Sequence, residues 1–305
     1  MRSLFRSLII AALMISSCTS TKKGSNSAIG PSFDLQGHRG ARGLMPENTI
    51  PAMKVAIDHG VTTVELDVVI SKDNKVVVSH DPYFNELITT TPEGKHLTKK
   101  EAEELVLYQM MYDEIKKYDV GLKPHPNFPK QQKIKVHKPL LSELIDSVED
   151  YAKSKGKSIR YNIEIKSKKS GDGVNHPAPE NFSELVLAVI KGKNILNRTT
   201  IQSFDIRPLQ YIHKAHPVVT LSYLVEKTTQ SIEDQFAALG FQPQTYSPNY
   251  AILTKEAVAY CHQRKIKVLP WTVNNLSEMN KLIELGVDGI ISDYPDLFAQ
   301  LGVRK

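Results

Sequence analysis

Cysteine is scarce in this chain, which has 305 residues and only two cysteines, Cys18 and Cys261. If Cys18 carries a lipid, the mature chain has no second cysteine with which Cys261 could form an internal disulfide. Stability must then come from a hydrophobic core, which a chain of this size can supply. Cys261, in a helix-like segment, is then best explained as a small buried apolar residue.

The sequence also lacks a long basic run. Its 39 lysines and arginines exceed its 33 acidic residues only slightly and give a formal net charge of +6. This mild excess suits an anionic substrate or surface, and no nucleic-acid partner is expected.

The N-terminus has an apolar run, Leu8–Ile15, that is too short to span a bilayer as a stable helix. Two arginines precede it, and an Ile-Ser-Ser-Cys sequence ending at Cys18 follows it, an arrangement that resembles a bacterial lipoprotein signal. We therefore expect a lipoprotein signal peptide at 1–17, a lipid on Cys18 and a flexible tether at 18–32. The protein would then be anchored to a membrane of the cell envelope, on the periplasmic or outer-membrane side. An ordinary signal peptide with an incidental cysteine is the alternative.

From Phe33 onward, strand-like and helix-like segments alternate, which predicts βα units and a single domain at 33–305. The first helix is expected from Ile50 to His59, with Asn48 or Thr49 as its cap. A closed barrel of such units has eight places for strands, but nine segments read as strands. They are FDLQGHR, TTVELDVVI, KVVVSHD, SIRYNIEIKS, RTTIQSFD, VVTLSYLV, QTYSPNY, IKVLPWTVN and GVDGIISD. Either one segment is misassigned or one lies outside the barrel.

Residues 82–138 break the alternation with a polar stretch that contains several prolines and histidines. So long an irregular piece between two strands is usually functional. We expect it to be an insertion that folds over the active site, with one short helix near Lys99–Tyr108.

Ionisable side chains gather near the ends of four of the expected strands. In a parallel α/β barrel, chemistry takes place at the carboxyl ends of the strands. These side chains are His38 and Arg39, Glu65 and Asp67, His80 and Asp81, and Glu164 and Lys166. Residues two apart on a strand leave the same face, as Glu65 and Asp67 do and as Glu164 and Lys166 do, and in a barrel these faces can all point at one central spot.

The candidate metal ligands among them are three carboxylates with no cysteine, which suits a hard cation such as Ca²⁺ or Mg²⁺. A metal at Glu65, Asp67 and Glu164 would neutralise a phosphate group, while Arg39 and Lys166 would hold its remaining charge. Carboxylates inside apolar strands are hard to explain structurally, because an unpaired buried charge is costly.

The two histidines at strand ends, His38 and His80, can serve as a general base and a general acid, because their unperturbed pKa of about 6.5 lies near working pH. A lone histidine is more often structural, but both have an arginine or an aspartate as neighbour. Phe204 and Trp271 are candidates for the wall of the substrate pocket, although core packing is nearly as good an explanation.

Four further residues have two interpretations. Glu47 and Asn48 are either partners of His38 or helix-start residues. Asp81 either orients a neighbouring side chain or caps the turn before Pro82, and the structural role is preferred. Asp293 is expected to cap the exit of the last strand, and a role at the rim of the pocket is the weaker interpretation.

As a set, the HRG…PENT segment, the E-L-D pair, the H-D ending and the I-E-I-K strand resemble the glycerophosphodiester phosphodiesterase family. The resemblance covers nearly all of the chain from Phe33 and implies a (β/α)8 TIM barrel with an insertion after an early strand. It implies that Glu65, Asp67 and Glu164 are metal ligands, that the two histidines are catalytic, and that Arg39 and Lys166 contact phosphate.

The reaction implied is hydrolysis of a glycerophosphodiester to glycerol 3-phosphate and an alcohol. In that chemistry the glycerol 2-hydroxyl attacks phosphorus, and water then opens the cyclic phosphate. Two alternatives remain: a related barrel phosphodiesterase for lysophospholipids or phosphoinositides, and a non-catalytic lipoprotein that binds anionic ligands. The sequence leaves open the metal, the alcohol and which histidine is the base.

Overall fold

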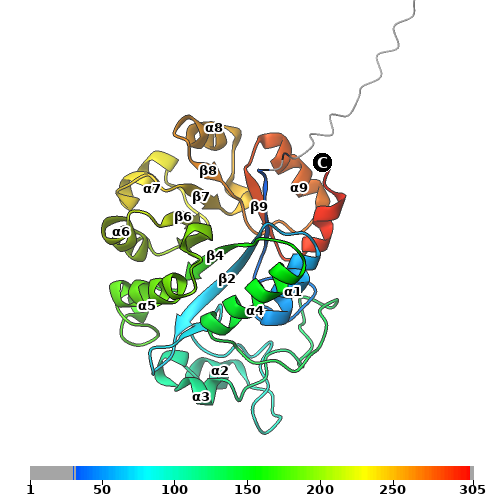
Figure 1. Ribbon diagram of the computed structural model, residues 1–305. Coiled ribbons are helices and arrows are strands. Elements are labelled where there is room, and N and C mark those ends of the chain that lie inside the picture. The colour runs from blue at the N-terminus through cyan, green and yellow to red at the C-terminus, as the bar shows by residue number, and fades with distance from the viewer. Residues whose placement is uncertain (1–29, 31, 303–305) are drawn as a thin grey trace, which may run out of the picture.

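The computed structural model describes residue 30 and residues 32–302, so the expected signal peptide and Cys18 lie outside the described residues. Eight parallel strands form one curved sheet in the order β8-β7-β6-β5-β4-β2-β1-β9 (Figure 1). They are β1 (Asp34–Gly37), β2 (Thr63–Ile70), β4 (Arg160–Ile165), β5 (Thr199–Ser203), β6 (Thr220–Val225), β7 (Thr245–Pro248), β8 (Lys267–Val268) and β9 (Gly289–Ser292).

The two ends of the sheet come together into a near-closed barrel. Although β8 has only two residues, the backbone N–H of Asp288 donates to the carbonyl of Val268 at 2.9 Å, and that of Ile291 donates to Pro270 at 3.1 Å. Pro270 has no N–H to give to a ladder, which accounts for the short β8. The predicted (β/α)8 barrel is confirmed.

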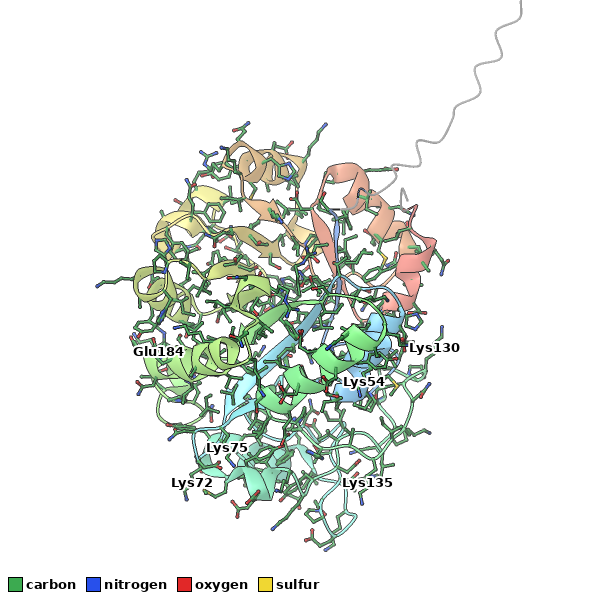
Figure 2. All side chains as sticks on the ribbon, in the orientation of Figure 1. Lys54, Lys72, Lys75, Lys130, Lys135 and Glu184 are labelled. Carbon is green, nitrogen blue, oxygen red and sulfur yellow. The ribbon has the colours of Figure 1, made fainter. Side chains whose placement is uncertain are left out.

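The ninth strand candidate is β3 (Val76–Val78), which lies outside the barrel and runs antiparallel to β2. The turn between these two strands, marked by Lys72 and Lys75, lies at the periphery of the molecule (Figure 2). Because β3 runs back along β2, it returns the chain toward the barrel, where the N–H of Ser79 donates to the carbonyl of Asp67 at 3.0 Å. His80 therefore reaches the carboxyl end of the barrel from a hairpin and not from a barrel strand.

Helices surround the strands (Figure 1). They are α1 (Ile50–Asp58), α4 (Leu141–Ser154), α5 (Pro179–Gly192), α6 (Ile206–Ala215), α7 (Ile232–Leu239), α8 (Lys255–Gln263) and α9 (Leu276–Leu285). Thr49 is the cap of α1, accepting a hydrogen bond from the N–H of Ala52, and α9 ends at Gly286 in the left-handed conformation. Among the described residues, none of the helices is long and apolar enough to cross a membrane.

The core lies between strands and helices, and β2 shows how it is divided from the site. Every residue of β2 is buried. Val64, Leu66 and Val68 alternate into the main hydrophobic cluster, and full burial of such a side chain is worth about 1.5–3 kcal/mol. The intervening Glu65 and Asp67 take the opposite face, because successive side chains of a strand alternate. Cys261 is fully buried in the same cluster, as predicted.

The 82–138 segment holds α2 (Lys99–Glu104), a short 3₁₀ turn (Leu107–Gln109) and α3 (Tyr112–Ile115). The expected helix is thus shorter than predicted, and α3 was not expected. Apolar side chains of the segment form a second cluster with Val69 and Val77 of the β2–β3 hairpin. The segment approaches the site through Phe128, whose ring centre lies 4.6 Å from the guanidinium carbon of Arg42. Its role as a cover for the site stays a prediction.

Candidate active site

A cavity of about 400 Å³ opens at the carboxyl ends of the barrel strands, and we call it the carboxyl-end cavity. It brings together eight of the nine residues predicted for the site, and the ninth, Asp67, is buried beside them. Its lining is His38, Arg39, Arg42, Glu65, His80, Glu164, Lys166, Gln202, Phe204, Leu224, Glu226, Trp271, Thr272 and Ile291.

A tight turn after β1 fixes the first part of the site. Arg39 has a φ of 50° and Gly40 a φ of 83°, so the backbone here is left-handed. The turn lets the N–H of Arg39 donate to Glu65 Oε2 at 2.7 Å and that of Gly40 donate to the backbone carbonyl of Glu65 at 3.1 Å. A glycine is required at position 40 because a Cβ there would lie 2.6 Å from the carbonyl carbon of Ala52.

Replacing Gly40 with alanine is expected to lower the free energy of unfolding by about 3 kcal/mol, since strain and overlap add, and to lower activity by displacing Arg39. Gly60→Ala is the matched control, because Gly60 has the same φ of 83° but nothing within 4 Å of an added Cβ. The control is expected to cost about 1 kcal/mol and to leave activity unchanged. Urea denaturation and a rate assay on both variants check this; equal losses would contradict it.

Three buried carboxylates form the centre of the site: Glu65, Asp67 and Glu164 offer oxygens that all lie within 4.8 Å of one another. Burial and the nearby Asp67 charge raise the pKa of Glu65 well above its ordinary value. Burial likewise raises the pKa of Glu164 to about 7, although Lys166 works against the rise. For Asp67 burial is outweighed by the positive charges of His80, Lys166 and Arg39, and its pKa is lowered.

Two cations flank these carboxylates. Lys166 Nζ lies 2.8 Å from Glu164 and 3.8 Å from Asp67, and Arg39 Nε lies 3.4 Å from Asp67. Burial works against the charge of Arg39, but the surrounding carboxylates raise its pKa above the ordinary value. Three carboxylates with oxygen donors only, held in one buried group and crowded enough to raise two of their pKa values, suit a hard divalent cation. The residues present therefore fit Ca²⁺ or Mg²⁺ and do not choose between them.

His38 is held by a carboxylate that is distant in sequence. Its Nδ1 lies 2.6 Å from Asp293 Oδ1, and the side-chain amide of Asn274 donates to Asp293 Oδ2 at 2.7 Å. The His38 side chain is 13% exposed, and burial lowers its pKa despite the opposing effect of Asp293. With Nδ1 bound to a carboxylate, His38 is held as the tautomer whose Nε2 can accept a proton.

His80 has an equivalent arrangement nearer to solvent. Its Nδ1 lies 2.8 Å from Asp81 Oδ1, the amide of Asn85 donates to Asp81 Oδ2 at 2.9 Å, and the His80 side chain is 31% exposed. Burial is outweighed by the hydrogen bond and charge of His80, so that the pKa of Asp81 is lowered. Each histidine thus has its Nδ1 next to an aspartate that is itself bonded by an asparagine, and the two differ in exposure to solvent.

The carboxylate partners of the histidines are where sequence interpretation fell short. Asp293 was expected chiefly to cap a strand and Asp81 to belong to a turn, yet each bonds a histidine. Glu47 bonds Arg39 at 2.9 Å, and Asn48 bonds Asp67 at 2.8 Å, so neither bonds His38.

Gln202 was missed entirely, although its amide donates to Glu65 Oε1 at 2.8 Å. A polar residue inside the apolar strand sequence TTIQSF was the one signal available for it.

An aromatic wall closes one side of the cavity. Phe204 and Trp271 meet edge to face with ring centres 5.3 Å apart, and the Trp271 indole N–H donates to the carbonyl of Ser247 at 2.8 Å. Lys166 Nζ lies 5.8 Å from the centre of the Phe204 ring. The wall therefore borders directly on the charged centre of the site.

Comparison with known proteins gives a consistent result. Residues 38–297 match the profile of the "Glycerophosphoryl diester phosphodiesterase family". A glycerophosphodiester phosphodiesterase of Caldanaerobacter subterraneus is 32% identical over 88% of this chain and 96% of the relative.

Among solved structures, a Silicibacter pomeroyi protein assigned to the same activity has a TM-score of 0.79 and 31% identity, covering 91% of this chain and 97% of its own. An Oleispira antarctica phosphodiesterase, solved in complex with the product sn-glycerol-3-phosphate, has a TM-score of 0.69 and 22% identity, covering 88% and 96%. At that identity it supports the fold.

Proposed function

The chain belongs to the glycerophosphoryl diester phosphodiesterase family, and we propose that it hydrolyses glycerophosphodiesters to glycerol 3-phosphate and an alcohol with the help of a divalent metal ion. One observation carries the proposal. Two histidines, each bonded to a carboxylate, line the same cavity as two cations and two members of the three-carboxylate group. The carboxyl-end cavity therefore has groups that can transfer protons, bind a metal ion and bind a phosphate.

Glu65, Asp67 and Glu164 would hold the metal ion, which when bound neutralises phosphate charge and polarises the phosphorus–oxygen bonds. Arg39 and Lys166 would bind the remaining phosphate oxygens, and the planar guanidinium of Arg39 suits two-point contact. The backbone bond from Arg39 to Glu65 keeps the phosphate-binding and metal-binding parts of the site in register.

Within this proposal His38 is the base and His80 the acid. His38 is the more buried, and its lowered pKa keeps it neutral near pH 7, as a base must be. Its Nε2 takes the proton of the glycerol 2-hydroxyl as that oxygen attacks phosphorus. The more exposed His80, held by Asp81, gives a proton to the departing alcohol oxygen. A cyclic glycerol phosphate forms, and water then opens it with the roles of the histidines reversed.

The test uses purified protein stripped of metal and supplied with glycerophosphocholine or glycerophosphoethanolamine. Glycerol 3-phosphate should appear only when Ca²⁺ or Mg²⁺ is added back. Absence of release with either metal, from protein that is folded by circular dichroism, would overturn the proposal. Lysophospholipids would then be tried, and after them the binding of anionic ligands without turnover.

Asp293→Asn is expected to lower kcat by about 10²–10⁴-fold, the range of general acid–base catalysis, with KM changed little. The amide can hold the wrong tautomer of His38, and loss of the negative charge lowers the pKa of His38 further. Since a base must be neutral, the acidic limb of the pH profile of kcat/KM should move to lower pH. A profile that keeps its acidic limb in place would contradict the role of Asp293.

We also propose that Cys18 carries the lipid anchor and places the enzyme in the cell envelope. The support is the sequence pattern around Cys18. Metabolic labelling with a fatty-acid analogue should mark the full chain, and Cys18→Ala should lose both the label and membrane association. Labelling that persists in the variant would overturn the proposal.

A further inference from the structure

A second cavity of about 400 Å³ lies at the other end of the barrel, and we call it the amino-end cavity. Several of its lining residues are the first residues of strands, among them Arg160 of β4, Thr199 of β5 and Thr220 of β6. It shares no described lining residue with the carboxyl-end cavity. Its lining is Asp34, Gln36, Arg160, Asn162, Asn197, Arg198, Thr199, Thr200, Thr220, Ser222, Gln244, Thr245, Lys265, Lys267 and Leu269.

A ladder of buried amides crosses the barrel interior toward this cavity. Gln36 Nε2 donates to Asp34 Oδ2 at 2.9 Å, and Asn162 Nδ2 donates to Gln36 Oε1 at 2.8 Å and to Gln202 Oε1 at 2.9 Å. The ladder ends at Glu65, to which Gln202 donates. Its direction is fixed at the Asp34 end, because an ionised carboxylate only accepts hydrogen bonds.

The direction of the ladder fixes the orientation of the central amide. Gln36 must turn its NH₂ to Asp34 and its oxygen to Asn162, so Asn162 must present its own NH₂ to Gln36. The amide oxygen of Asn162 therefore bonds neither Gln36 nor Gln202, and it has no hydrogen-bond partner among the described residues. Among the other unpaired buried atoms of the described residues is Ser222 Oγ.

Both unpaired atoms belong to side chains that line the amino-end cavity, and these residues are only 2% and 1% exposed. A buried polar atom without a partner costs about 1–3 kcal/mol. An amide oxygen needs a donor, and a serine hydroxyl both donates and accepts. A ligand hydroxyl placed between the two atoms would satisfy both, by donating to Asn162 Oδ1 and accepting from Ser222 Oγ.

The charges around this cavity favour an anion. Arg160 is paired with Asp34 at 3.0 Å, and Arg198 with Glu149 at 2.7 Å. Lys265 and Lys267 have no ion pair within the described residues. The cavity thus has hydroxyl and amide groups inside and two uncompensated positive charges in its lining.

We propose that the amino-end cavity is a second binding site, separate from the catalytic one, for a small hydroxylated anion such as a polyol phosphate. A hydroxyl of the ligand bonds Asn162 Oδ1 and Ser222 Oγ, and its anionic group lies against Lys265 and Lys267. The cavity, at about 400 Å³, has room for a ligand of this size.

The probe is glycerol 2-phosphate, titrated into the full chain by calorimetry. Wild-type protein should bind at two sites, because the catalytic cavity also holds a phosphate-binding pair. Lys166→Gln should lose the catalytic site and keep the other. Lys265→Gln combined with Lys267→Gln should do the reverse, and Lys99→Gln with Lys100→Gln, the same charge change on α2, should keep both.

Two further measurements address the hydroxyl. Ser222→Ala should weaken binding at the amino-end site about tenfold, the size of one lost hydrogen bond, and inorganic phosphate should bind there at least that much more weakly than glycerol 2-phosphate. A single site that Lys166→Gln abolishes would mean that the cavity holds solvent only, and would overturn the proposal. Equal affinity for phosphate would overturn its hydroxyl component. Both readouts are independent of turnover, so failure here differs from failure of the proposed activity.

Discussion

Glu65→Gln is expected to abolish metal-dependent turnover while leaving the fold intact. The amide has the shape of the carboxylate but lacks its charge, and one of three anionic ligands is lost. Replacing a residue that only hydrogen-bonds to a metal ligand already lowers metal affinity by about 10–100-fold. For loss of a ligand itself we expect Ca²⁺ or Mg²⁺ to bind at least about 100-fold more weakly. Calorimetric titration of metal and assay of glycerol 3-phosphate release check both effects.

Glu184→Gln is the matched control, since Glu184 lies on α5 at the surface (Figure 2), bonded to His216 and remote from the cavity lining. It makes the same chemical change and should leave metal affinity and turnover unaltered. If Glu65→Gln bound metal as tightly as wild type, the three-carboxylate group would not be the metal site. The acidic residues would then act only to hold Arg39 and Lys166.

The parts of the site that could be predicted are those fixed by local geometry. The alternation of side chains along β2 is enough to place Glu65 and Asp67 on one face, and the structure agrees. The two-residue spacing of Glu164 and Lys166 is informative for the same reason. Nothing beyond a strand and its polar positions is needed for either inference.

The parts that could not be predicted depend on contacts between distant segments. Asp293 lies 255 residues from His38, and its partner Asn274 comes from a third segment. The sequence does not show that Asp293 and His38 are partners, because an aspartate that follows a strand can equally serve as a cap. The direction of β3 was also beyond the sequence, since KVVVSHD reads as a strand whichever way it pairs.

The two histidines should respond differently to the quality of the leaving group. His80→Ala removes the acid, so turnover of glycerophosphocholine should fall by about 10²–10⁴-fold. With a glycerophosphodiester of nitrophenol, which leaves without a proton, most of that loss should disappear. His38→Ala removes the base, and its loss, of similar size, should be the same for both substrates because each still needs the glycerol 2-hydroxyl to be deprotonated. Initial rates of alcohol release from the two substrates, which report the first step and not the opening of the cyclic phosphate, check this.

Comparing the two substrates decides which histidine is the base and which is the acid. The hydrogen bonds do not decide this, since each histidine bonds an aspartate through Nδ1. His216→Ala is the control, a histidine bonded to Glu184 and outside the lining of the carboxyl-end cavity, and it should alter neither rate. If nitrophenol rescued His38→Ala and not His80→Ala, the roles would be reversed, and the more exposed histidine would be the base. Rescue of both variants would mean that neither histidine protonates the alcohol alone. The difference in exposure, 13% against 31%, favours the first outcome, because a buried neutral imidazole next to the attacking hydroxyl needs no displacement of water before it accepts the proton.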